Sequence, residues 1–408
     1  MSITTAEIQL GTEPGEVGFS TVERAWLKQA HVVVLTNFLR KLHVDVLELV
    51  QRRVGKLTVL LSTPMEPDRQ WEPEWGCLDV VIQKNWTLIR KWRHSRGFQE
   101  DNFIHIPYDT QTQLKRLRPD VVAAFELGFR TLLSSMYTRH RVPLVSVGNM
   151  SEQIEKERGW ARRRLRKMLL SRADCFTFNG PSCRRYLEYL GVEAEKLALF
   201  PYFFDVAKAS REPKKFSSGR PRRLLFSGNL TLRKGIEPMV RALAEWAKEN
   251  PDRLLELRVC GAGPEEVHFK TLLPGNLQVD LRGACNDQQL AESYHWADIC
   301  LFPTLADEWG LVPIEAFASG CPVVGSLAAQ SMEVYGREGS NGWFYEADEP
   351  NGLARAIGRA LDTDSVQLEQ MSLVCREAVA GITAEDCAEK FCRALLTAKA
   401  NFDGRSSG

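Results

Sequence analysis

Apolar runs rich in β-branched residues alternate along the chain with stretches of helical periodicity. Residues 31–38 (HVVVLTNF) and 56–62 (KLTVLLS) flank an amphipathic stretch at 44–54. Continuous apolar runs separated by helices predict βαβ units and a parallel sheet covered on both faces. Further strands are expected at 78–82, 120–125, 143–147 and 175–178.

The pattern stops at residues 206–221 (VAKASREPKKFSSGRP), whose Lys, Ser, Gly and Pro content predicts an exposed linker. A second α/β series follows. Its strands are expected at 223–227, 254–260, 277–281, 299–303 and 322–325, and its helices at 236–248, 287–295 and 313–318. We therefore expect two doubly wound domains facing a cleft, with ligands beyond the carboxyl ends of the strands.

Composition is that of a soluble globular protein: the 408 residues are 44% hydrophobic and 26% charged. Ten scattered cysteines without a CxxC pair predict reduced thiols in a cytoplasmic protein. Neither a secretory signal nor a run of ~20 apolar residues is evident. Lys and Arg outnumber Asp and Glu by 30 to 24 in residues 1–205, and are outnumbered 28 to 23 afterwards. The basic half favours an anionic surface or acceptor.

Two carboxylates, Asp307 and Glu315, stand eight residues apart around a Trp-Gly turn that leads into an apolar helix. Acids accept hydrogen bonds from sugar or ribose hydroxyls, while the turn and helix start offer backbone N–H groups to a diphosphate. The segment therefore predicts a polyhydroxylated, phosphorylated ligand. The alternative is a pair of acids that only stabilise the helix dipole.

A second candidate site follows the strand at 223–227, where Gly228 and Asn229 open a loop that carries Arg233 and Lys234. Glycine permits close backbone approach, and two cations near a helix start favour an anion. The loop thus predicts a phosphate site without a Walker A sequence. The alternative is a strand-to-helix turn with solvated basic residues.

Gly261 and Gly263 also follow a strand, but a dinucleotide fingerprint needs a third glycine at the position of Glu266. A dehydrogenase is therefore excluded.

Together these segments resemble the retaining GT-B glycosyltransferases of family 4, a part of group 1, and within it bacterial enzymes of polysaccharide or glycolipid assembly. The resemblance covers most of residues 170–360 and is weak before residue 140. The matching segments are FSGNLTLRKG (226–235), CGAGP (260–264), ADICLFP (297–303), DEWGLVPIEAFASGCPVVGS (307–326) and NGWF (341–344), with NGPSCRRYLEYLG (179–191) and FPYFFD (200–205) upstream.

The resemblance implies a nucleotide-sugar donor held by the second domain and an acceptor held by the first. Lys234 matches the group that meets the donor diphosphate, Asp307 the acid that contacts the transferred sugar, and Glu315 the acid that holds the ribose. The turn whose amides approach the phosphates matches Gly310, Leu311 and Val312.

Two residues depart from the family pattern. Asn229 stands where many members have Arg, and Arg233 could supply the missing charge, since a guanidinium forks well onto phosphate. The first acid is Asp307 rather than Glu, and the neighbouring Glu308 could take over the sugar contact. Either change could alter donor choice or weaken activity.

In mechanism, Lys234 and Arg233 would neutralise the leaving diphosphate as the glycosidic bond breaks. The family is pictured as reacting on one face of the sugar, with the leaving phosphate taking the acceptor's proton, so no protein nucleophile is needed. No metal or other cofactor is expected. The one D-x-D sequence, Asp362-Thr363-Asp364, is expected to be a solvent-exposed linker between C-terminal helices and not a metal site.

On the acceptor side, residues 37–48 (NFLRKLHVDVLE) resemble the first strand-to-helix loop of some family members. The resemblance implies that His43 takes the basic position usual there, as a general base or hydroxyl contact. A surface histidine at a helix start is the alternative. Glu126, just past the strand at 120–125, is a second acceptor candidate, against a capping or solvated role.

The stretch from Arg158 to Arg172 (RGWARRRLRKMLLSR) holds seven basic residues and no acid, with Trp160, Leu165, Met168 and Leu169 on roughly one helical face. Such a helix can rest on anionic lipid, placing the protein at the inner face of the membrane. A solvated helix packed on the core is the alternative. Nucleic acid is not expected as a partner.

We thus expect a hexosyltransferase acting on a polysaccharide, lipid-linked or other glycan acceptor. An inactive nucleotide-sugar-binding scaffold and a nucleotide-sugar epimerase are the alternatives. The expected parts are a partly disordered polar leader (1–30), an acceptor domain (31–205), the linker (206–221), a donor domain (222–383), and a C-terminal helix and tail (384–408) that packs back on the first domain.

Overall fold

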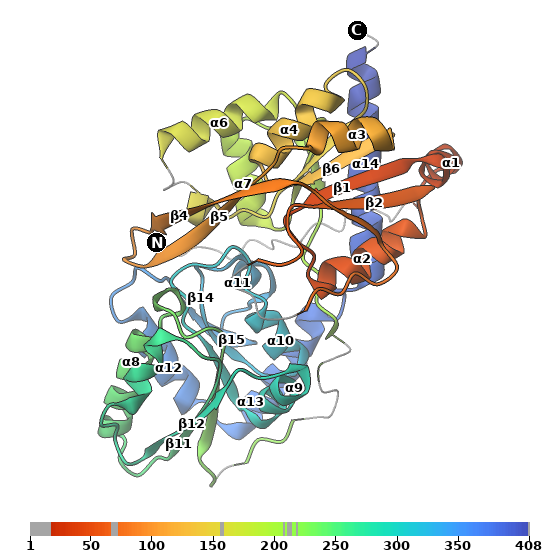
Figure 1. Cartoon of the computed structure of the whole chain (residues 1–408). Coiled ribbons are helices and arrows are strands. Elements are labelled where there is room, and N and C mark those ends of the chain that lie inside the picture. The colour runs from red at the N-terminus through yellow and green to blue at the C-terminus, as the bar shows by residue number, and fades with distance from the viewer. Residues whose placement is uncertain are drawn as a thin grey trace.

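Two lobes, each a parallel sheet covered by helices, make up the protein (Figure 1). The structure is a computed structural model that describes residues 18–66, 72–155, 159–206, 209, 214–217 and 219–406. The predicted pair of doubly wound parallel sheets is confirmed.

The first sheet has the strand order β3-β2-β1-β6-β7-β8-β9, and all of its neighbouring strands are parallel. Its strands are β1 (His31–Thr36), β2 (Lys56–Leu61), β3 (Asp79–Ile82), β6 (Val121–Phe125), β7 (Leu144–Val147), β8 (Cys175–Phe178) and β9 (Leu197–Leu199). The surrounding helices are α1 (Thr21–Gln29), α2 (Lys41–Gln51), α3 (Thr110–Leu117), α4 (Phe129–Thr138), α5 (Glu152–Glu155), α6 (Trp160–Leu170), α7 (Pro181–Leu190) and the 3-10 turn η1 (Ala194–Lys196). Because both faces are covered, β1, β2 and β6 are buried almost throughout and lack a polar face.

The second sheet has the order β12-β11-β10-β13-β14-β15, again all parallel. Its strands are β10 (Arg222–Ser227), β11 (Leu255–Cys260), β12 (Leu277–Gly283), β13 (Ile299–Phe302), β14 (Val323–Ser326) and β15 (Gly342–Tyr345). The helical segments are η3 (Leu232–Lys234), α8 (Ile236–Glu249), η4 (Pro264–Lys270), α9 (Asp287–Trp296), α10 (Val312–Ala318), α11 (Gln330–Tyr335), α12 (Gly352–Asp362) and α13 (Ser365–Val379).

The last helix, α14 (Ala384–Ser406), leaves the second lobe and lies along the first (Figure 1). It contacts α2 and strands β8 and β9. The Phe391 ring lies 5.1 Å from that of Phe200, and the apolar residues on its inner face are buried. The helix therefore ties the two lobes together through a shared hydrophobic core.

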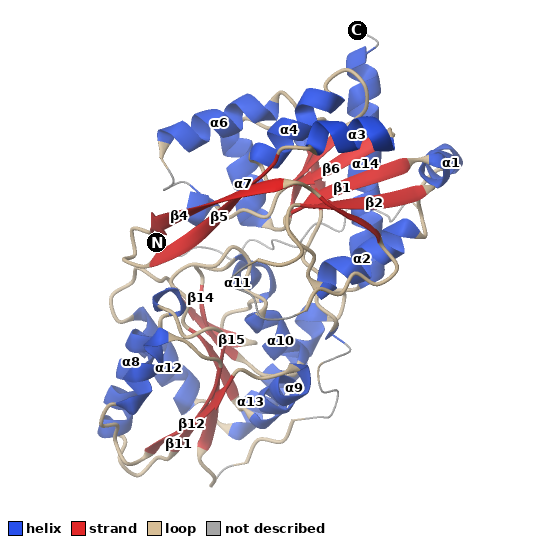
Figure 2. Ribbon diagram, in the orientation of Figure 1, coloured by secondary structure: helices blue, strands red, loops and turns tan. Residues whose placement is uncertain are grey.

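A two-stranded antiparallel hairpin, β4 (Asn85–Arg93) and β5 (Gln99–Pro107), was not predicted (Figure 2). It crosses toward the second lobe. At its tip, Arg96 pairs with Asp348 at 2.5 Å and donates a hydrogen bond to the Leu305 carbonyl. The side chain of Phe98 is buried beside Ala306.

Two segments expected to be irregular, the leader and the linker, are described only in part. Residues 1–17 of the predicted leader lie outside the described residues, but the following segment forms α1, with Ser20 and Glu23 in a capping box. The predicted exposed linker is described only in part, and there Lys214 and Phe216 are buried. The Lys214 ammonium donates to the carbonyls of Tyr294, at 2.7 Å, and Ala297, so it satisfies the C-terminal end of α9.

The carboxyl edges of the two sheets face each other. Gln330, at the start of α11, donates from Nε2 to the carbonyls of Met150 (2.8 Å) and Glu308 (2.6 Å), and its Oε1 accepts from the Cys183 amide. The ring of Tyr202 stacks on that of Trp309 with centroids 5.5 Å apart. Loops that follow the strands of both sheets therefore meet at the interface, and ligands of open parallel sheets bind beyond the carboxyl ends of the strands.

Candidate active site

The loop after β10 is held by the loop after β11. The Leu230 amide donates to the Ala262 carbonyl at 2.9 Å. A Cβ on Gly261 would lie 1.9 Å from the Gly228 carbonyl oxygen, and one on Gly263 would lie 2.3 Å from that of Leu230. Gly261 and Gly263, which do not form a dinucleotide fingerprint, thus allow the loop after β11 to contact the loop after β10. This contact holds the predicted phosphate loop in place.

The basic residues of η3 meet the first acid of the Asp-to-Glu segment. Lys234 Nζ lies 2.6 Å from Asp307 Oδ2, and Arg233 Nη1 lies 3.3 Å from the same oxygen and 3.1 Å from the Ala306 carbonyl oxygen. Gly235 has φ +68°, and a Cβ there would lie 2.0 Å from the Pro303 carbonyl oxygen. Only glycine allows the two loops to approach this closely.

The two cations beside Asp307 favour its ionised form over the neutral acid. Burial alone would raise its pKa, but the Lys234 ammonium and the Arg233 guanidinium outweigh burial and lower the pKa to about 2. The site therefore holds two cations, Lys234 and Arg233, beside one anion, Asp307.

Replacing Asp307 by Asn should flatten the pH dependence of stability in the acid range. The folded pKa of about 2 lies below the ordinary value of 3.8, so in this window the unfolded chain binds the extra proton and the free energy of unfolding rises with pH. The ion pair adds about 2 kcal/mol to the free energy of unfolding at pH values above the ordinary pKa. This contribution is lost as the pH falls toward the folded pKa. Urea unfolding of wild type, Asp307→Asn and the exposed-acid control Asp252→Asn across this range measures the slope. Equal slopes for wild type and Asp307→Asn would contradict the ion pair.

Glu315 lies in a different environment, in the wall of a cleft of about 610 Å³ between the lobes. Burial raises its pKa, and Asp287 adds to the rise, while a hydrogen bond from the Tyr294 hydroxyl to Oε2 (2.7 Å) opposes it. The opposite wall includes Arg40 and Lys41 at the start of α2. Sequence reasoning did not find Tyr294 or these two basic residues, because only the fold brings them to Glu315.

The remaining donor-side residues have structural contacts. Gly310 has φ +87°, and a Cβ there would lie 2.9 Å from the Phe302 ring. The Leu311 carbonyl accepts from the Glu315 amide, so the turn runs directly into α10, which begins at Val312. Asn229 is exposed, and the Glu308 carbonyl is taken by Gln330. These residues thus lie in or next to the loops after β10 and β13, while Glu315 lies in the cleft wall.

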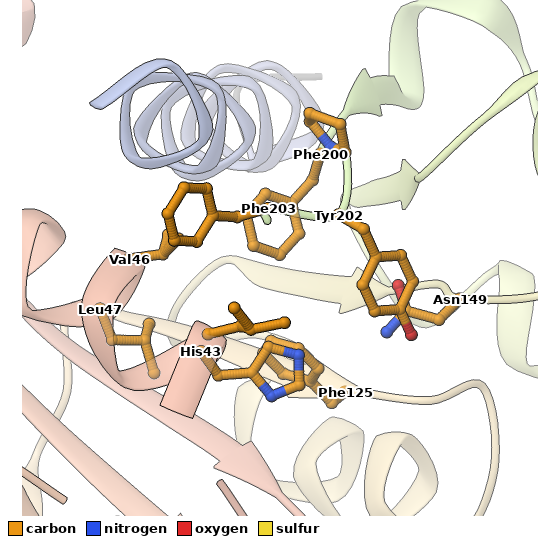
Figure 3. Close-up of a pocket in the computed structure, with 10 residues that line it drawn as sticks. His43, Val46, Leu47, Phe125, Asn149, Phe200, Tyr202 and Phe203 are labelled. Carbon is orange, nitrogen blue, oxygen red and sulfur yellow. The ribbon is translucent and has the colours of Figure 1, made fainter. Parts of the chain in front are cut away.

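His43 lies apart from these residues, on α2 against the Phe125 ring (Figure 3). Burial, and to a lesser degree Arg40, lower its pKa to about 3, so the imidazole is neutral and only weakly basic. The cavity beside it, next to Asn149 and Tyr202, has a volume of about 20 Å³, which holds one water and no sugar. The geometry favours neither a general base nor a surface residue at this position.

Glu126 directly follows β6 with φ +72°, a conformation rare for any residue but glycine. Its Oε1 accepts a 2.8 Å hydrogen bond from Asn37 Nδ2, and its Oε2 lies 3.5 Å from Arg130 Nη1. The side chain is 61% exposed. It is therefore held in place and still exposed.

The basic helix differs from its predicted form. Arg158 lies outside the described residues, and α6 starts at Trp160. Leu169 is buried while Trp160 is 70% exposed, so the four apolar residues do not share one face. Arg166 is also buried, 2.5 Å from the buried Glu155. The described basic residues left exposed are Arg163, Arg164 and Lys167.

Structural roles account for the D-x-D sequence. Asp362 lies 2.7 Å from Arg253, and Asp364 caps α13 by accepting from the Gln367 amide. Within the described ranges, no group of three or more His, Cys, Asp and Glu side chains could hold a metal ion, and no helix is long and apolar enough to cross a membrane.

Comparison with known proteins shows similarity to group 1 glycosyltransferases in the second lobe. Residues 221–363 match the family described as Glycosyl transferases group 1. A D-inositol 3-phosphate glycosyltransferase of Corynebacterium diphtheriae is 26% identical over 62% of this chain and 63% of its own length. The chain spans between about a third and two thirds of the length of the curated relatives it matches.

Solved structures share the fold across both lobes. The lipopolysaccharide outer core galactosyltransferase WaaB superposes with a TM-score of 0.67 at 11% identity, covering 90% of this chain and 99% of WaaB. HepE of Anabaena, in complex with UDP, superposes with a TM-score of 0.65 at 16% identity over 90% of this chain and 99% of HepE. The GT-B architecture is therefore confirmed.

Proposed function

We propose that this chain, whose residues 221–363 match the group 1 glycosyltransferases, transfers a sugar from a nucleotide-diphosphate donor to a hydroxyl acceptor with retention of configuration. The observation that carries the proposal is the meeting of Lys234, Arg233 and Asp307 at the carboxyl ends of β10 and β13. Two preorganised cations there suit the charge that builds up on a leaving diphosphate.

The donor would lie across the second sheet. Its diphosphate would displace Asp307 from Lys234 and Arg233, which frees the carboxylate for the hydroxyls of the transferred sugar. Its ribose would reach Glu315 in the wall of the cleft. The UDP bound to HepE supports a nucleotide ligand for this architecture.

Neutralisation of the leaving group needs no metal in this scheme, because Lys234 and Arg233 supply the positive charge. The acceptor would enter from the first domain, on the side of Glu126. The exposed basic residues of α6 would favour an anionic membrane surface, as expected for a lipid-linked or polysaccharide acceptor.

A thermal-shift screen against nucleoside diphosphates and their sugars, followed by chelator-treated turnover assays, tests this function. A ligand at 100 times its dissociation constant should stabilise the fold by about 2.7 kcal/mol. We expect a shift with one nucleotide class, slow release of free sugar, and transfer with EDTA present. Binding without any release or transfer would favour the inactive scaffold, and interconversion of donor sugars without acceptor would favour the epimerase.

A further inference from the structure

The first sheet has its own topological switch point, between β1 and β6. From β1 the chain adds β2 and β3 on one side, whereas β6 to β9 lie on the other. In open α/β sheets, ligands bind outside the carboxyl ends of strands at such a point. Asn37 follows β1 there and Glu126 follows β6. In the second sheet the equivalent point, between β10 and β13, holds Lys234 and Asp307.

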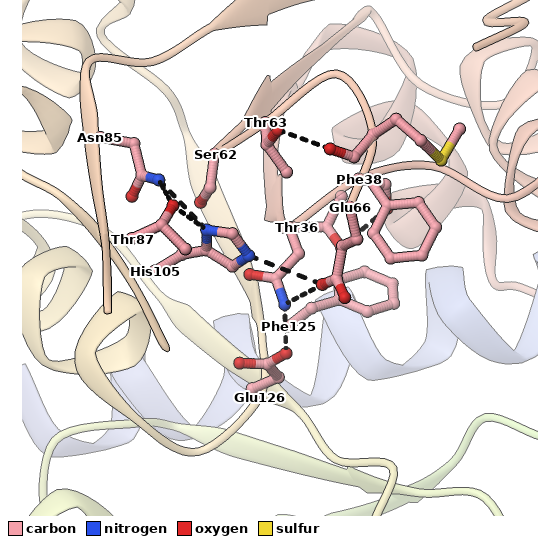
Figure 4. A network of polar contacts seen from close by, with 12 residues as sticks. Thr36, Phe38, Ser62, Thr63, Glu66, Asn85, Thr87, His105, Phe125 and Glu126 are labelled. Atoms are coloured by element: carbon pink, nitrogen blue, oxygen red, sulfur yellow. Dashed lines mark hydrogen bonds and ion pairs between the residues drawn. The ribbon is translucent and has the colours of Figure 1, made fainter. Parts of the chain in front are cut away.

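A polar network from several segments fills this point (Figure 4). Asn37 Nδ2 donates to Glu126 Oε1 at 2.8 Å and to Glu66 Oε1 at 3.4 Å. The buried Arg130 guanidinium donates to the Asn37 side-chain oxygen, to the Phe125 carbonyl (2.8 Å) and to Ser62 Oγ (3.2 Å). Its Nη1 and Nη2 thus face oxygen atoms of the protein and are not presented to the cleft.

Three buried polar atoms in the network lack a hydrogen bond among the described residues: His105 Nε2, Asn85 Oδ1 and Arg130 Nε. His105 is 5% exposed, and its Nδ1 contacts Thr87 Oγ1 at 3.0 Å. Its Nε2 points toward Glu66 Oε1, 3.6 Å away, which is beyond hydrogen-bond length, and finds no other partner among the described residues. A buried polar group in this state normally has a ligand or water partner.

The accessible part of the network therefore accepts hydrogen bonds and is negative. Glu126 is 61% exposed, whereas the compensating Arg130 is 2% exposed. Two other cations, Arg40 and Lys41, line the cleft wall opposite Glu315 and make no hydrogen bond or ion pair with this network among the described residues. Lys41 instead lies 3.7 Å from Glu74. A hydroxyl can donate to the carboxylates of Glu126 and Glu66. A phosphate brought to the same place would meet these carboxylates, while the Arg130 guanidinium that could offset its charge is buried.

We propose that this network binds the reacting hydroxyl of the acceptor, and that the sugar or polyol bearing that hydroxyl is uncharged. Phosphomonoesters at that position are excluded by Glu126 and Glu66. This inference rests on the proposed transferase function and names its acceptor class. It separates this chain from the relatives whose printed name is D-inositol 3-phosphate glycosyltransferase.

The test is a binding measurement without donor, so that it stands apart from the transferase assay. Saturation-transfer NMR would compare myo-inositol with D-inositol 3-phosphate, and methyl glucoside with glucose 6-phosphate, at millimolar concentration. We expect each neutral compound to bind about tenfold better than its phosphate, since like charges at close range are strongly unfavourable. Glu126→Ala should abolish binding of the neutral compounds, and Glu126→Gln should bring the two members of each pair closer.

The matched control is Glu193→Gln, an exposed acid paired with Lys196 at 2.6 Å outside this edge of the sheet. It should leave both affinities unchanged, and unfolding curves should verify that each variant is folded. Tighter binding of the phosphates to wild type, or no binding of either neutral compound, would overturn the proposal. A thermal shift with a nucleotide should be measured on the same protein sample. If the acceptor proposal fails but the nucleotide still shifts the melting temperature, the transferase function is unaffected. If the nucleotide causes no shift, that result counts against the transferase function and not against the acceptor proposal.

Discussion

Replacing Lys234 by alanine should lower kcat/KM for sugar transfer by on the order of a hundredfold to a thousandfold, as removal of one preorganised charge-stabilising donor does in other enzymes. Lys234 Nζ lies 2.6 Å from Asp307 Oδ2, beside Arg233, at the place we assign to the leaving diphosphate. The effect should fall mainly on kcat, because the charge on the phosphate grows as the glycosidic bond breaks. Initial rates over a range of donor concentrations measure both constants.

The matched control for this experiment is Arg241→Ala, on the helix that follows the loop. Arg241 is exposed and pairs only loosely with Glu237, at 3.4 Å. Its replacement should leave both kinetic constants near those of wild type. The fold of Lys234→Ala should persist, since Arg233 still faces Asp307. Wild-type turnover by Lys234→Ala would remove this lysine from the reaction.

The fold could be predicted from the sequence where burial leaves a strong signal. Strands such as β1 and β6 are covered on both faces, so their apolar runs identify them. The β4–β5 hairpin escaped prediction because β4 is largely exposed, and its mixed apolar and basic residues follow no burial period. Lys214 shows the same limit, since a polar, Pro-containing segment predicts exposure and only tertiary contacts bury it.

The candidate site could be predicted only in pieces. Gly228 to Lys234 and Asp307 to Glu315 each suggested a ligand, but more than seventy residues separate Lys234 from Asp307, and nothing local pairs them. The resemblance joined them, and the geometry then showed an ion pair that neither loop predicts alone. On the acceptor side, the sequence suggested Glu126 from its place after a strand. It could not supply the rest of the network, in which Asn37 contacts Glu126 and Glu66, and Glu66 faces His105. These residues come together only because the loops after β1, β2 and β6 and the strand β5 meet in the fold.

Replacing Glu315 by glutamine should weaken donor binding by about tenfold to a hundredfold while leaving the fold as stable as wild type or more stable. Loss of a charged hydrogen-bond acceptor accounts for the weakening. The stability follows from the raised pKa of Glu315, for which burial is the main cause. A raised folded pKa means that folding favours the protonated form of Glu315. The stability that this form contributes is present below the unfolded pKa and is lost as the pH rises through the folded pKa. At neutral pH a neutral isostere therefore avoids a cost that the carboxylate carries.

Calorimetric titration of the nucleoside diphosphate found by the thermal-shift screen, together with its 2′- and 3′-deoxy analogues, would identify the contact as one to ribose. Glu315→Gln should lose affinity for the ribose form and lose little for an analogue that already lacks the contacted hydroxyl, which gives a coupling energy in the double-mutant cycle. Tyr294→Phe is the matched control, because it removes the 2.7 Å hydrogen bond to Oε2 but keeps the carboxylate. It should weaken binding less than Glu315→Gln. Equal losses for ribose and both deoxy forms would place Glu315 elsewhere than on the ribose, and unchanged affinity would remove it from the donor site.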